Sequence, residues 1–296
     1  MYLLLKFWGG KLLVIIAIII GITSSYLLLP GTIKFIERNN KTVKNYRGKF
    51  IYNSAGIFFT LVILLICVFY SILGLIVLDL SDIHSNILVI TAGVLSASFT
   101  GYLDDNSVDK AKGIIGHGKL LLKGIFTSGG IKALIGIAVS FIISLALHNK
   151  SYSLILNTLL ISMMQNFINL LDLRPGRAIK AYIALSLITL PSIIFSSVFI
   201  GLNSGLIAAL LFYLPYELKE KCVMGDVGSN VLGILQGIII ASSKSFLLKI
   251  IILFFIVTVQ TYAEKKSITC LIEDNSLLKF IDMIGRKKHN HEYDKD

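Results

Sequence analysis

Long apolar runs separated by short polar segments extend along almost the whole chain. A transmembrane helix needs roughly 20 consecutive apolar residues to cross a hydrocarbon core of about 30 Å. Nine runs approach or reach this length, although the seventh and eighth are short: residues 11–29, 54–78, 86–103, 128–147, 152–171, 179–199, 203–217, 229–241 and 246–263. The pattern predicts an all-α, polytopic membrane helix bundle of about nine transmembrane helices.

The composition excludes a soluble globular protein. Of 296 residues, 55% are hydrophobic and 15% are charged, and the mean hydropathy is +0.81. A soluble domain carries about 25% charged residues. The first run follows Lys6 and Lys11 but lacks a small-residue cleavage site, so we expect a retained span rather than a signal peptide. Three widely separated cysteines form neither a disulfide framework nor a CxxC motif: Cys67, Cys222 and Cys270.

The distribution of charge predicts the orientation. The N-terminus is placed outside and the C-terminus in the cytosol, because all but five of the 28 Lys and Arg residues then lie in or beside cytosolic segments. The five exceptions are Lys6, Lys11, Lys150, Lys244 and Lys249. This is the positive-inside pattern of membrane proteins. It explains the net charge of +11 without a nucleic-acid partner.

Four aspartates lie where predicted spans meet the cytosol: Asp104, Asp105, Asp172 and Asp226. A carboxylate at the membrane edge is costly unless something compensates its charge, so such residues are candidates for function. Any one of them alone is equally compatible with a helix cap or a topology marker. Because they occur at three places on one predicted face, together they indicate a cation site.

The Asp104-Asp105 pair ends the third predicted span in the sequence Gly101-Tyr102-Leu103-Asp104-Asp105. Carboxylates suit Mg²⁺, which commonly joins one or two of them to substrate phosphates. A glycine-rich basic segment follows and contains further candidates for phosphate binding, namely Lys112, His117 and Lys119. A cytosolic loop that obeys the positive-inside rule would have a similar composition, and this alternative stays open.

Two further motifs fall on the same predicted face. Asn166, Asn169 and Asp172 recur every three residues and therefore lie near one side of a helix. Their amides suit a nucleobase or ribose, but helix–helix hydrogen bonding would also need them. The third motif is Met224-Gly225-Asp226-Val227-Gly228-Ser229. Its glycines permit close approach of the backbone to a ligand, and a helix start offers N–H groups to phosphate.

In combination these segments resemble the polyprenyl-phosphate N-acetylhexosamine-1-phosphate transferases, glycosyltransferase family 4. That family includes the phospho-N-acetylmuramoyl-pentapeptide transferase and the UDP-GlcNAc:undecaprenyl-phosphate GlcNAc-1-phosphate transferase. Residues 101–105 resemble its G-x-x-D-D element, residues 166–172 its N-x-x-N-x-x-D element, and residues 224–229 its (F/M)-G-D-x-G-S element. The order and spacing agree over roughly residues 10 to 286.

The resemblance implies a magnesium-dependent transfer of a sugar-1-phosphate from a UDP-sugar to a membrane polyprenyl phosphate, with release of UMP. It also implies a bacterial plasma-membrane location, a site facing the cytosol, and an assembly that is either monomeric or homodimeric. Asp104 or Asp105 would handle the lipid phosphate, and Asp226 would hold Mg²⁺ or Mn²⁺, with Asp105 as a second metal ligand. The donor would contact Asn166, Asn169, Asp172, Gly225 and Ser229.

The second motif departs from the family. The family continues it as D-G-x-D-G-L-A, whereas this chain has Asp172-Leu173-Arg174-Pro175-Gly176-Arg177-Ala178. One carboxylate is lost and two arginines are gained, which makes Arg174 and Arg177 candidates for binding the donor, because arginine binds phosphate bidentately. They are also compatible with the positive-inside rule. The family's histidine-rich loop between its last two spans has no equivalent here.

Two other functions stay open. A polyprenyl-phosphate-binding pseudoenzyme or regulator would explain the altered motif, and a membrane transporter would explain polar residues near the bilayer. The domain prediction is one transmembrane unit over residues 1–286 and a charged, disordered cytosolic tail over residues 287–296. A short surface helix is expected near Ser276–Ile284.

Overall fold

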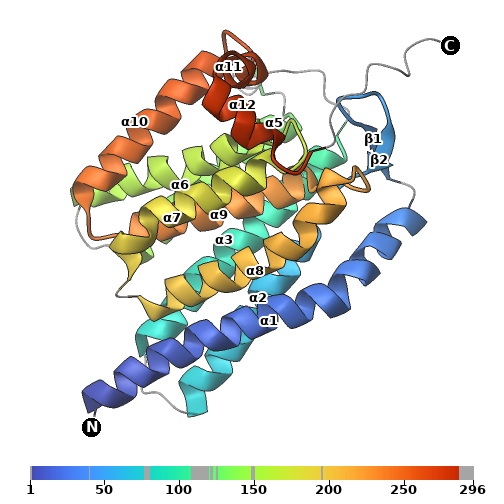
Figure 1. The fold of residues 1–296 in the computed structure, drawn as a ribbon. Coiled ribbons are helices and arrows are strands. Elements are labelled where there is room, and N and C mark those ends of the chain that lie inside the picture. The colour runs from blue at the N-terminus through green and yellow to red at the C-terminus, as the bar shows by residue number, and fades with distance from the viewer. Residues whose placement is uncertain are drawn as a thin grey trace, which may run out of the picture.

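A computed structural model describes residues 2–39, 41–76, 81–107, 120, 123–124, 126–147, 151–194 and 196–286. The described part is a helical bundle with one short hairpin (Figure 1). Its elements are α1 (Tyr2–Arg38), β1 (Thr42–Lys44), β2 (Phe50–Tyr52), α2 (Ile57–Ile76), α3 (Ser81–Asp105), α5 (Ser128–Leu147), α6 (Ser151–Leu171), α7 (Arg177–Ile193), α8 (Ser197–Leu218), α9 (Gly225–Ser242), α10 (Phe246–Ala263), α11 (Ile268–Asp274) and α12 (Ser276–Met283).

Among the described residues, eight helices are long and apolar enough to cross a membrane: α1, α2, α3, α5, α6, α8, α9 and α10. α7 has 17 residues and packs between α6, α8 and α9. The all-helical membrane bundle is therefore confirmed, while the count of nine spans and the orientation stay predictions. α12 confirms the short helix expected near the C-terminus, and the predicted tail over residues 287–296 lies outside the described residues.

The ends of several spans differ from the prediction. The sixth run was predicted as residues 179–199, but α7 ends at Ile193 and α8 begins at Ser197. No charged residue lies between residues 181 and 199, so hydropathy could not locate the break. The eighth run was predicted from residue 229, but α9 begins at Gly225 because its polar first turn is already helical. Here hydropathy placed the start of the span too late.

α9 is the central helix, and side chains along most of its length are buried. Close contacts at glycines let its neighbours approach: a Cβ at Gly101 of α3 would lie 2.4 Å from the Asp226 carbonyl oxygen, and one at Gly56 would lie 2.1 Å from the Gly228 Cα. A Cβ at Gly233 would lie 2.5 Å from the α6 backbone. Small residues bring transmembrane helices together in this way. They fix the ends of α3 and α6 against the start of α9.

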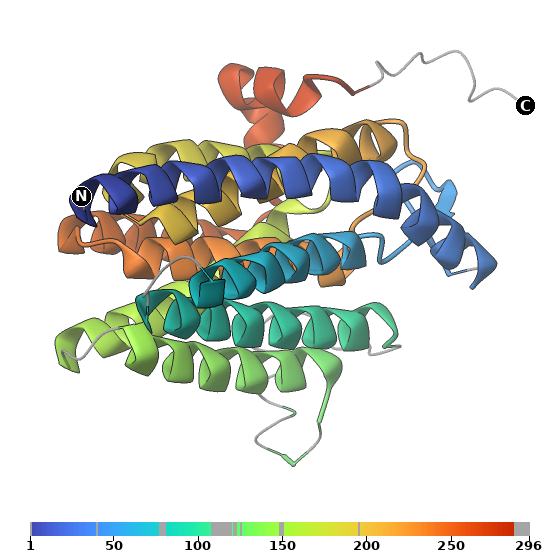
Figure 2. The same ribbon diagram turned by 90° about the horizontal axis from the view of Figure 1, so that it is seen from below.

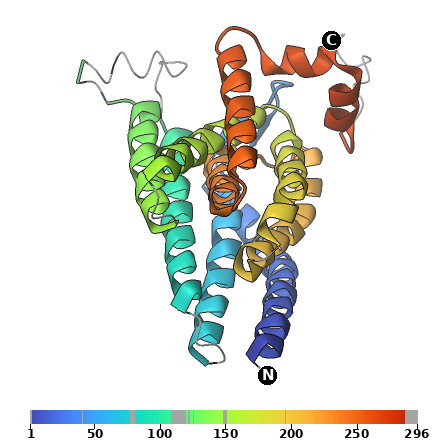
Figure 3. The ribbon, with the colours of Figure 1, turned by 90° about the vertical axis from the view of Figure 1, so that its left-hand side faces the viewer.

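The hairpin pairs β1 with β2 in an antiparallel register, with Val43 opposite Ile51. The chain after β2 continues beside the loop between α8 and α9, where Val223 N donates to Tyr52 O at 2.9 Å and Gly56 N donates to Met224 O at 2.9 Å. The hairpin therefore lies at the α9 N-terminal end of the bundle, opposite the start of α1 (Figure 3). Figure 2 shows α3 and α5 along one side and the C-terminal helices on the other.

A polar network crosses the middle of α7, α8 and α9. Tyr182 and Ser186 both donate to Asn203 Oδ1, at 2.7 and 3.1 Å, and Gln236 Nε2 donates to Thr189 Oγ1 at 3.3 Å. All five side chains are buried. Buried polar groups need such partners inside a membrane. The network accounts for polar residues in the span centres as helix–helix contacts.

Candidate functional site

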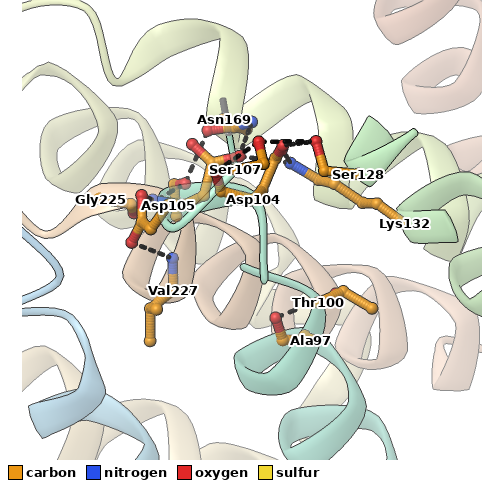
Figure 4. Close-up of polar contacts among 12 residues, drawn as sticks. Ala97, Thr100, Asp104, Asp105, Ser107, Ser128, Lys132, Asn169, Gly225 and Val227 are labelled. Carbon is orange, nitrogen blue, oxygen red and sulfur yellow. Dashed lines mark hydrogen bonds and ion pairs between the residues drawn. The ribbon is translucent and has the colours of Figure 1, made fainter. Parts of the chain in front are cut away.

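Three of the predicted motifs meet at one end of the bundle. Asp104 ends α3, Asn169 lies in the last turn of α6, and Asp226 lies in the first turn of α9. Figure 4 shows Asp104, Asn169 and Lys132 of α5 pointing toward a common centre. We call Asp104, Lys132, Asn169 and Asp226 the acid cluster. Residues separated by more than 50 positions in the sequence thus contribute to one polar site.

Lys132 lies between two carboxylates of the acid cluster. Its Nζ donates to Asp226 Oδ2 at 2.7 Å and to Asp104 Oδ2 at 3.3 Å. Ser128, one turn earlier in α5, donates from Oγ to Asp104 Oδ1 at 2.7 Å. The lysine side chain is 12% exposed, whereas the two carboxylates are 25% and 27% exposed. The two carboxylates are thus more exposed than the lysine that bonds to both of them.

Asn169 completes the acid cluster from α6. Its Nδ2 donates to Asp226 Oδ2 at 3.0 Å, and its Oδ1 accepts from Ser229 Oγ at 2.8 Å. Ser229 is fully buried and holds the amide in this orientation. Asn169 and Ser229 were predicted to bind the donor. In the structure they orient Asp226, which leaves only one edge of this amide for a ligand.

Asp105 is placed differently from its neighbour in the sequence. Its Oδ1 accepts from Asp226 N at 3.0 Å and from Asn53 Nδ2 at 3.2 Å, and its Oδ2 accepts from Ser54 Oγ at 2.7 Å and from Val227 N at 3.4 Å. The carboxylate therefore caps the start of α9, where free N–H groups and the helix dipole favour negative charge. A role for Asp105 as a metal ligand stays a prediction, and its four donors weigh against it.

Gly225 makes this cap sterically allowed. Its φ of +66° is in the left-handed region, which glycine adopts without strain. A Cβ there would lie 2.5 Å from Asp105 Oδ2 and 2.6 Å from Asn53 Oδ1. The sequence predicted that Gly225 lets the backbone approach a ligand. In the structure the group that approaches is the Asp105 carboxylate.

Two lysines of the site were missed by the sequence reasoning. Lys132 begins the second turn of α5, and Lys41 precedes β1 and donates from Nζ to Ser54 Oγ at 3.3 Å. Burial lowers the pKa of Lys41, and the nearby Asp105 carboxylate opposes that shift only in part. Both lysines look like ordinary positive-inside residues in the sequence. Their spacing from the aspartates gives no signal of contact.

Asp172 follows α6 and is also close to the other carboxylates. Burial raises the pKa of Asp172 well above its ordinary value, and the negative charges of Glu217, Asp226 and Asp105 raise it further. Glu217, which is buried, was not predicted; its Oε1 accepts from the backbone N–H of residue 176 at 2.7 Å. Among the described residues, no side chain hydrogen-bonds the Asn166 amide. Its predicted role in donor binding stays a prediction.

The basic candidates are distributed over different places. Arg177 is 5% exposed and binds Asp282 of α12 in a bidentate ion pair, with Nε–Oδ1 at 2.8 Å and Nη2–Oδ2 at 3.1 Å. Its guanidinium group is thus committed to the C-terminal segment. Arg174 stacks on the Tyr46 ring, with 4.3 Å between the guanidinium carbon and the ring centroid. The other three candidates lie outside the described residues: Lys112, His117 and Lys119.

Comparison with known proteins does not identify the chain. No model of a known protein family matches the sequence, and no curated protein matches it. The resemblance to the sugar-phosphate transferases therefore depends on the short motifs and on the geometry that brings them together. The function has to be argued from the groups of the acid cluster.

The acid cluster could hold a hard divalent cation only together with a ligand from a substrate. Among the described residues, no three His, Cys, Asp or Glu side chains are grouped to hold a metal ion. Mg²⁺ commonly takes one or two carboxylates and completes its shell with water and substrate phosphates. Asp104 and Asp226 offer hard oxygens on either side of an ammonium group, so the space between them already favours positive charge. The donor set fits Mg²⁺ or Mn²⁺ if a substrate phosphate contributes.

An apolar groove of about 540 Å³ lies between α1 and α2. It is lined by Ile16, Ile19, Ile20, Thr23, Ser24, Leu27, Leu28, Leu65, Phe69 and Leu73. None of these residues belongs to the helices that carry the acid cluster. The groove is therefore not part of the acid cluster and carries no assignment.

Proposed function

We propose that the protein transfers a sugar-1-phosphate, in particular an N-acetylhexosamine-1-phosphate, from a UDP-sugar to a membrane polyprenyl phosphate. UMP leaves, and a lipid-diphosphate-sugar for cell-envelope polymer synthesis remains in a bacterial plasma membrane. The observation that supports this most is the acid cluster, in which residues of three separate motifs meet. Lys132 donates to Asp104 and Asp226, and Asn169 donates to Asp226. A helix cap or a topology marker would not require these motifs to converge.

In this reaction an oxygen of the polyprenyl phosphate forms a bond to the β-phosphorus of the donor. The bond between that phosphorus and the bridging oxygen breaks, and the bridging oxygen leaves with UMP and takes the electron pair. Both reactants are anions, so catalysis depends mainly on positioning them and neutralising their charge. Lys132 supplies a fixed positive charge beside the reacting phosphates. Asp104 is available to accept a proton when the attacking phosphate carries one.

The residues that would hold Mg²⁺ or Mn²⁺ are Asp226 and Asp104, with the donor diphosphate completing the site. A bound divalent ion would supply charge neutralisation and polarise the phosphoryl oxygens. Asn169 then orients Asp226, and Ser229 orients Asn169. Asp105 acts on the same reaction indirectly, because its cap fixes the first turn of α9 and hence the position of Asp226.

A direct test is to incubate the purified protein with polyprenyl phosphate and a panel of radiolabelled UDP-sugars, with and without Mg²⁺. We expect a lipid-linked product from at least one donor, only with the divalent ion. Asp226→Asn and Asp104→Asn should each lower the rate by about 100-fold or more, the usual scale for a group that stabilises transition-state charge. Asp274→Asn, an exposed change in α11, is the matched control and should leave the rate unchanged.

A second function is favoured by the Lys132 contacts. An ammonium group that already bridges both carboxylates would suit a protein that binds polyprenyl phosphate without transferring sugar phosphate. If no donor gives product, the transferase proposal fails. Binding of polyprenyl phosphate that depends on Lys132 would then support the binding protein, and Lys132→Met is the variant to compare.

A further inference from the structure

A second polar region lies at the same end of the bundle and has the opposite charge. The guanidinium carbons of Arg174, Arg47 and Arg286 lie 4.3, 5.1 and 5.3 Å from the centroid of the Tyr46 ring. We call these four residues the arginine cage. Because all three guanidinium carbons lie near one ring centroid, the distances between them are comparable to the Debye length of about 8 Å at physiological salt, and their charges act together.

The hairpin presents Tyr46 in a fixed position. Glu220 in the loop between α8 and α9 accepts from Asn45 Nδ2 at 3.1 Å and from Tyr46 OH at 3.2 Å, and it pairs with Arg47 Nε at 3.3 Å. One carboxylate therefore binds three consecutive residues of the hairpin tip. The ring is held there for the arginines to stack on.

The C-terminal segment carries Arg286 to the same place. Asp282 is buried between Arg177 and Arg286, and its Oδ2 is 2.5 Å from Arg286 Nη1. Lys180 Nζ donates to the carbonyl oxygens of Ile281 and Asp282, at 2.9 and 2.7 Å. These contacts fix α12 on the end of α7. The arginine cage is thus assembled from three segments that are distant in the sequence.

Among the described residues, the arginines at and beside the arginine cage outnumber the carboxylates that pair with them. The described ion pairs place three arginines and two carboxylates here, since Asp282 pairs with both Arg177 and Arg286 while Glu220 pairs with Arg47. Arg174 is a fourth arginine beside the same ring. The Arg174 guanidinium has no hydrogen bond or ion pair with any described residue, and its contact with the Tyr46 ring uses none of its N–H donors. Within the described residues, Arg286 Nε is also buried without an acceptor. Gathered cations with free donors favour an anion.

We infer that the arginine cage is a second binding site, which takes a phosphate or diphosphate group. Arginine is suited to this ligand because its planar fork binds two phosphate oxygens while its face stacks on an aromatic ring. The phosphate can come from a soluble compound or from a lipid headgroup, since the cage lies where the bundle meets the aqueous side. The inference does not rest on sugar-phosphate transfer, because the cage and the acid cluster share no residue.

The soluble source is tested with inorganic pyrophosphate and the full-length protein in nanodiscs of zwitterionic lipid, without divalent ions, by calorimetric titration. We expect saturable binding that Arg174→Gln weakens by about tenfold or more, which corresponds to the loss of a charge-assisted hydrogen bond. Arg174→Lys should recover only part of the affinity, because lysine keeps the charge but not the planar fork. The control Lys266→Gln changes an exposed lysine outside the cage and should bind normally.

The lipid source is tested by native mass spectrometry of the delipidated protein titrated with phosphatidylglycerol. Retention that falls with Arg174→Gln but not with Lys266→Gln would identify a headgroup phosphate as the ligand. The inference is overturned if neither pyrophosphate nor phosphatidylglycerol binding depends on Arg174. Asp226→Asn should leave pyrophosphate binding intact without divalent ions. A failed transfer assay with intact, Arg174-dependent binding would therefore sink the transferase proposal alone.

Discussion

The acid cluster and the arginine cage lie at the same end of the bundle but have opposite charge. In the acid cluster, two carboxylates share the single ammonium group of Lys132, with Asp105 and Asp172 nearby. In the arginine cage, Arg47 pairs with Glu220 and Arg286 shares Asp282 with Arg177, while Arg174 has no ion pair with a described residue. Each region is thus incompletely neutralised by the described residues.

This difference shows what each region is suited to bind. A surplus of carboxylates favours a cation, and a surplus of guanidinium groups favours an anion. The two regions also differ in rigidity, because the acid cluster lies on the ends of packed helices, whereas the arginine cage uses a hairpin, a turn and the C-terminal segment.

The largest expected effect distinguishes Asp104 of the acid cluster from its neighbour in the sequence, Asp105. Asp105→Ala removes the acceptor of four hydrogen bonds at the start of α9, and each bond to a charged group contributes about 1.5 to 3 kcal/mol. We expect a loss of stability of about 4 kcal/mol or more, seen as a lower midpoint in thermal unfolding in detergent. Asp104→Asn should unfold normally and lose activity.

Equal unfolding midpoints for the Asp105→Ala and unaltered proteins would contradict the cap. Loss of folding in Asp104→Asn would contradict the assignment of that residue to the reaction. The pair is a matched comparison, since the two residues are adjacent in α3 and differ mainly in what their side chains contact.

The next effect concerns the arginine cage. Asp282→Ala leaves Arg177 and Arg286 without their shared carboxylate, and breaking a buried ion pair costs about 3 to 5 kcal/mol. We expect α11 and α12 to detach from the end of α7 while the bundle stays folded. Faster hydrogen–deuterium exchange over residues 268–284, with unchanged exchange in α9, would show this.

Glu273→Ala is the control, because Glu273 is exposed on α11 and has no described ion pair. Unchanged exchange over residues 268–284 in Asp282→Ala would show that other contacts hold the segment. In that case the arginine cage would not depend on the Arg177–Asp282 pair for its assembly.

The fold could be predicted from the sequence because apolar length is a direct physical requirement of the bilayer. The prediction was weakest for helix ends and short elements, because apolar length does not determine them. Residues 191–199 contain no charge, so the break between α7 and α8 was missed, and the polar first turn of α9 was taken for a loop. The hairpin was also missed, because its strands have only three residues each.

The site was predicted in part. The aspartate motifs were recognisable because carboxylates at a membrane edge are costly, and the structure brings Asp104 and Asp226 together. The different roles of Asp104 and Asp105 depend on which neighbours meet each side chain, and no sequence pattern reports this. Lys132 and Tyr46 were missed for the same reason. The roles of a lysine near the start of a helix and of a tyrosine in a basic loop depend on tertiary contacts.

The smallest expected effect concerns the ionisation of Asp172, which lies near the acid cluster. Burial, together with Glu217, Asp226 and Asp105, raises the pKa of Asp172 in the folded protein above its unfolded value of about 3.9. The folded state therefore holds this proton more tightly, and stability falls as the pH rises from that value through the raised pKa.

Asp172→Asn removes this dependence, because the amide does not ionise. We expect the variant to raise the midpoint of thermal unfolding by about 2 to 4 °C at pH 8 and to leave it nearly unchanged at pH 4. Asp274→Asn, which alters an exposed carboxylate of α11, should show no such difference between the two pH values. A rise of equal size at both pH values would mean that packing, rather than charge, explains the effect. A pH-dependent rise would show that the folded protein holds Asp172 in its neutral form, through its burial and the carboxylates near it.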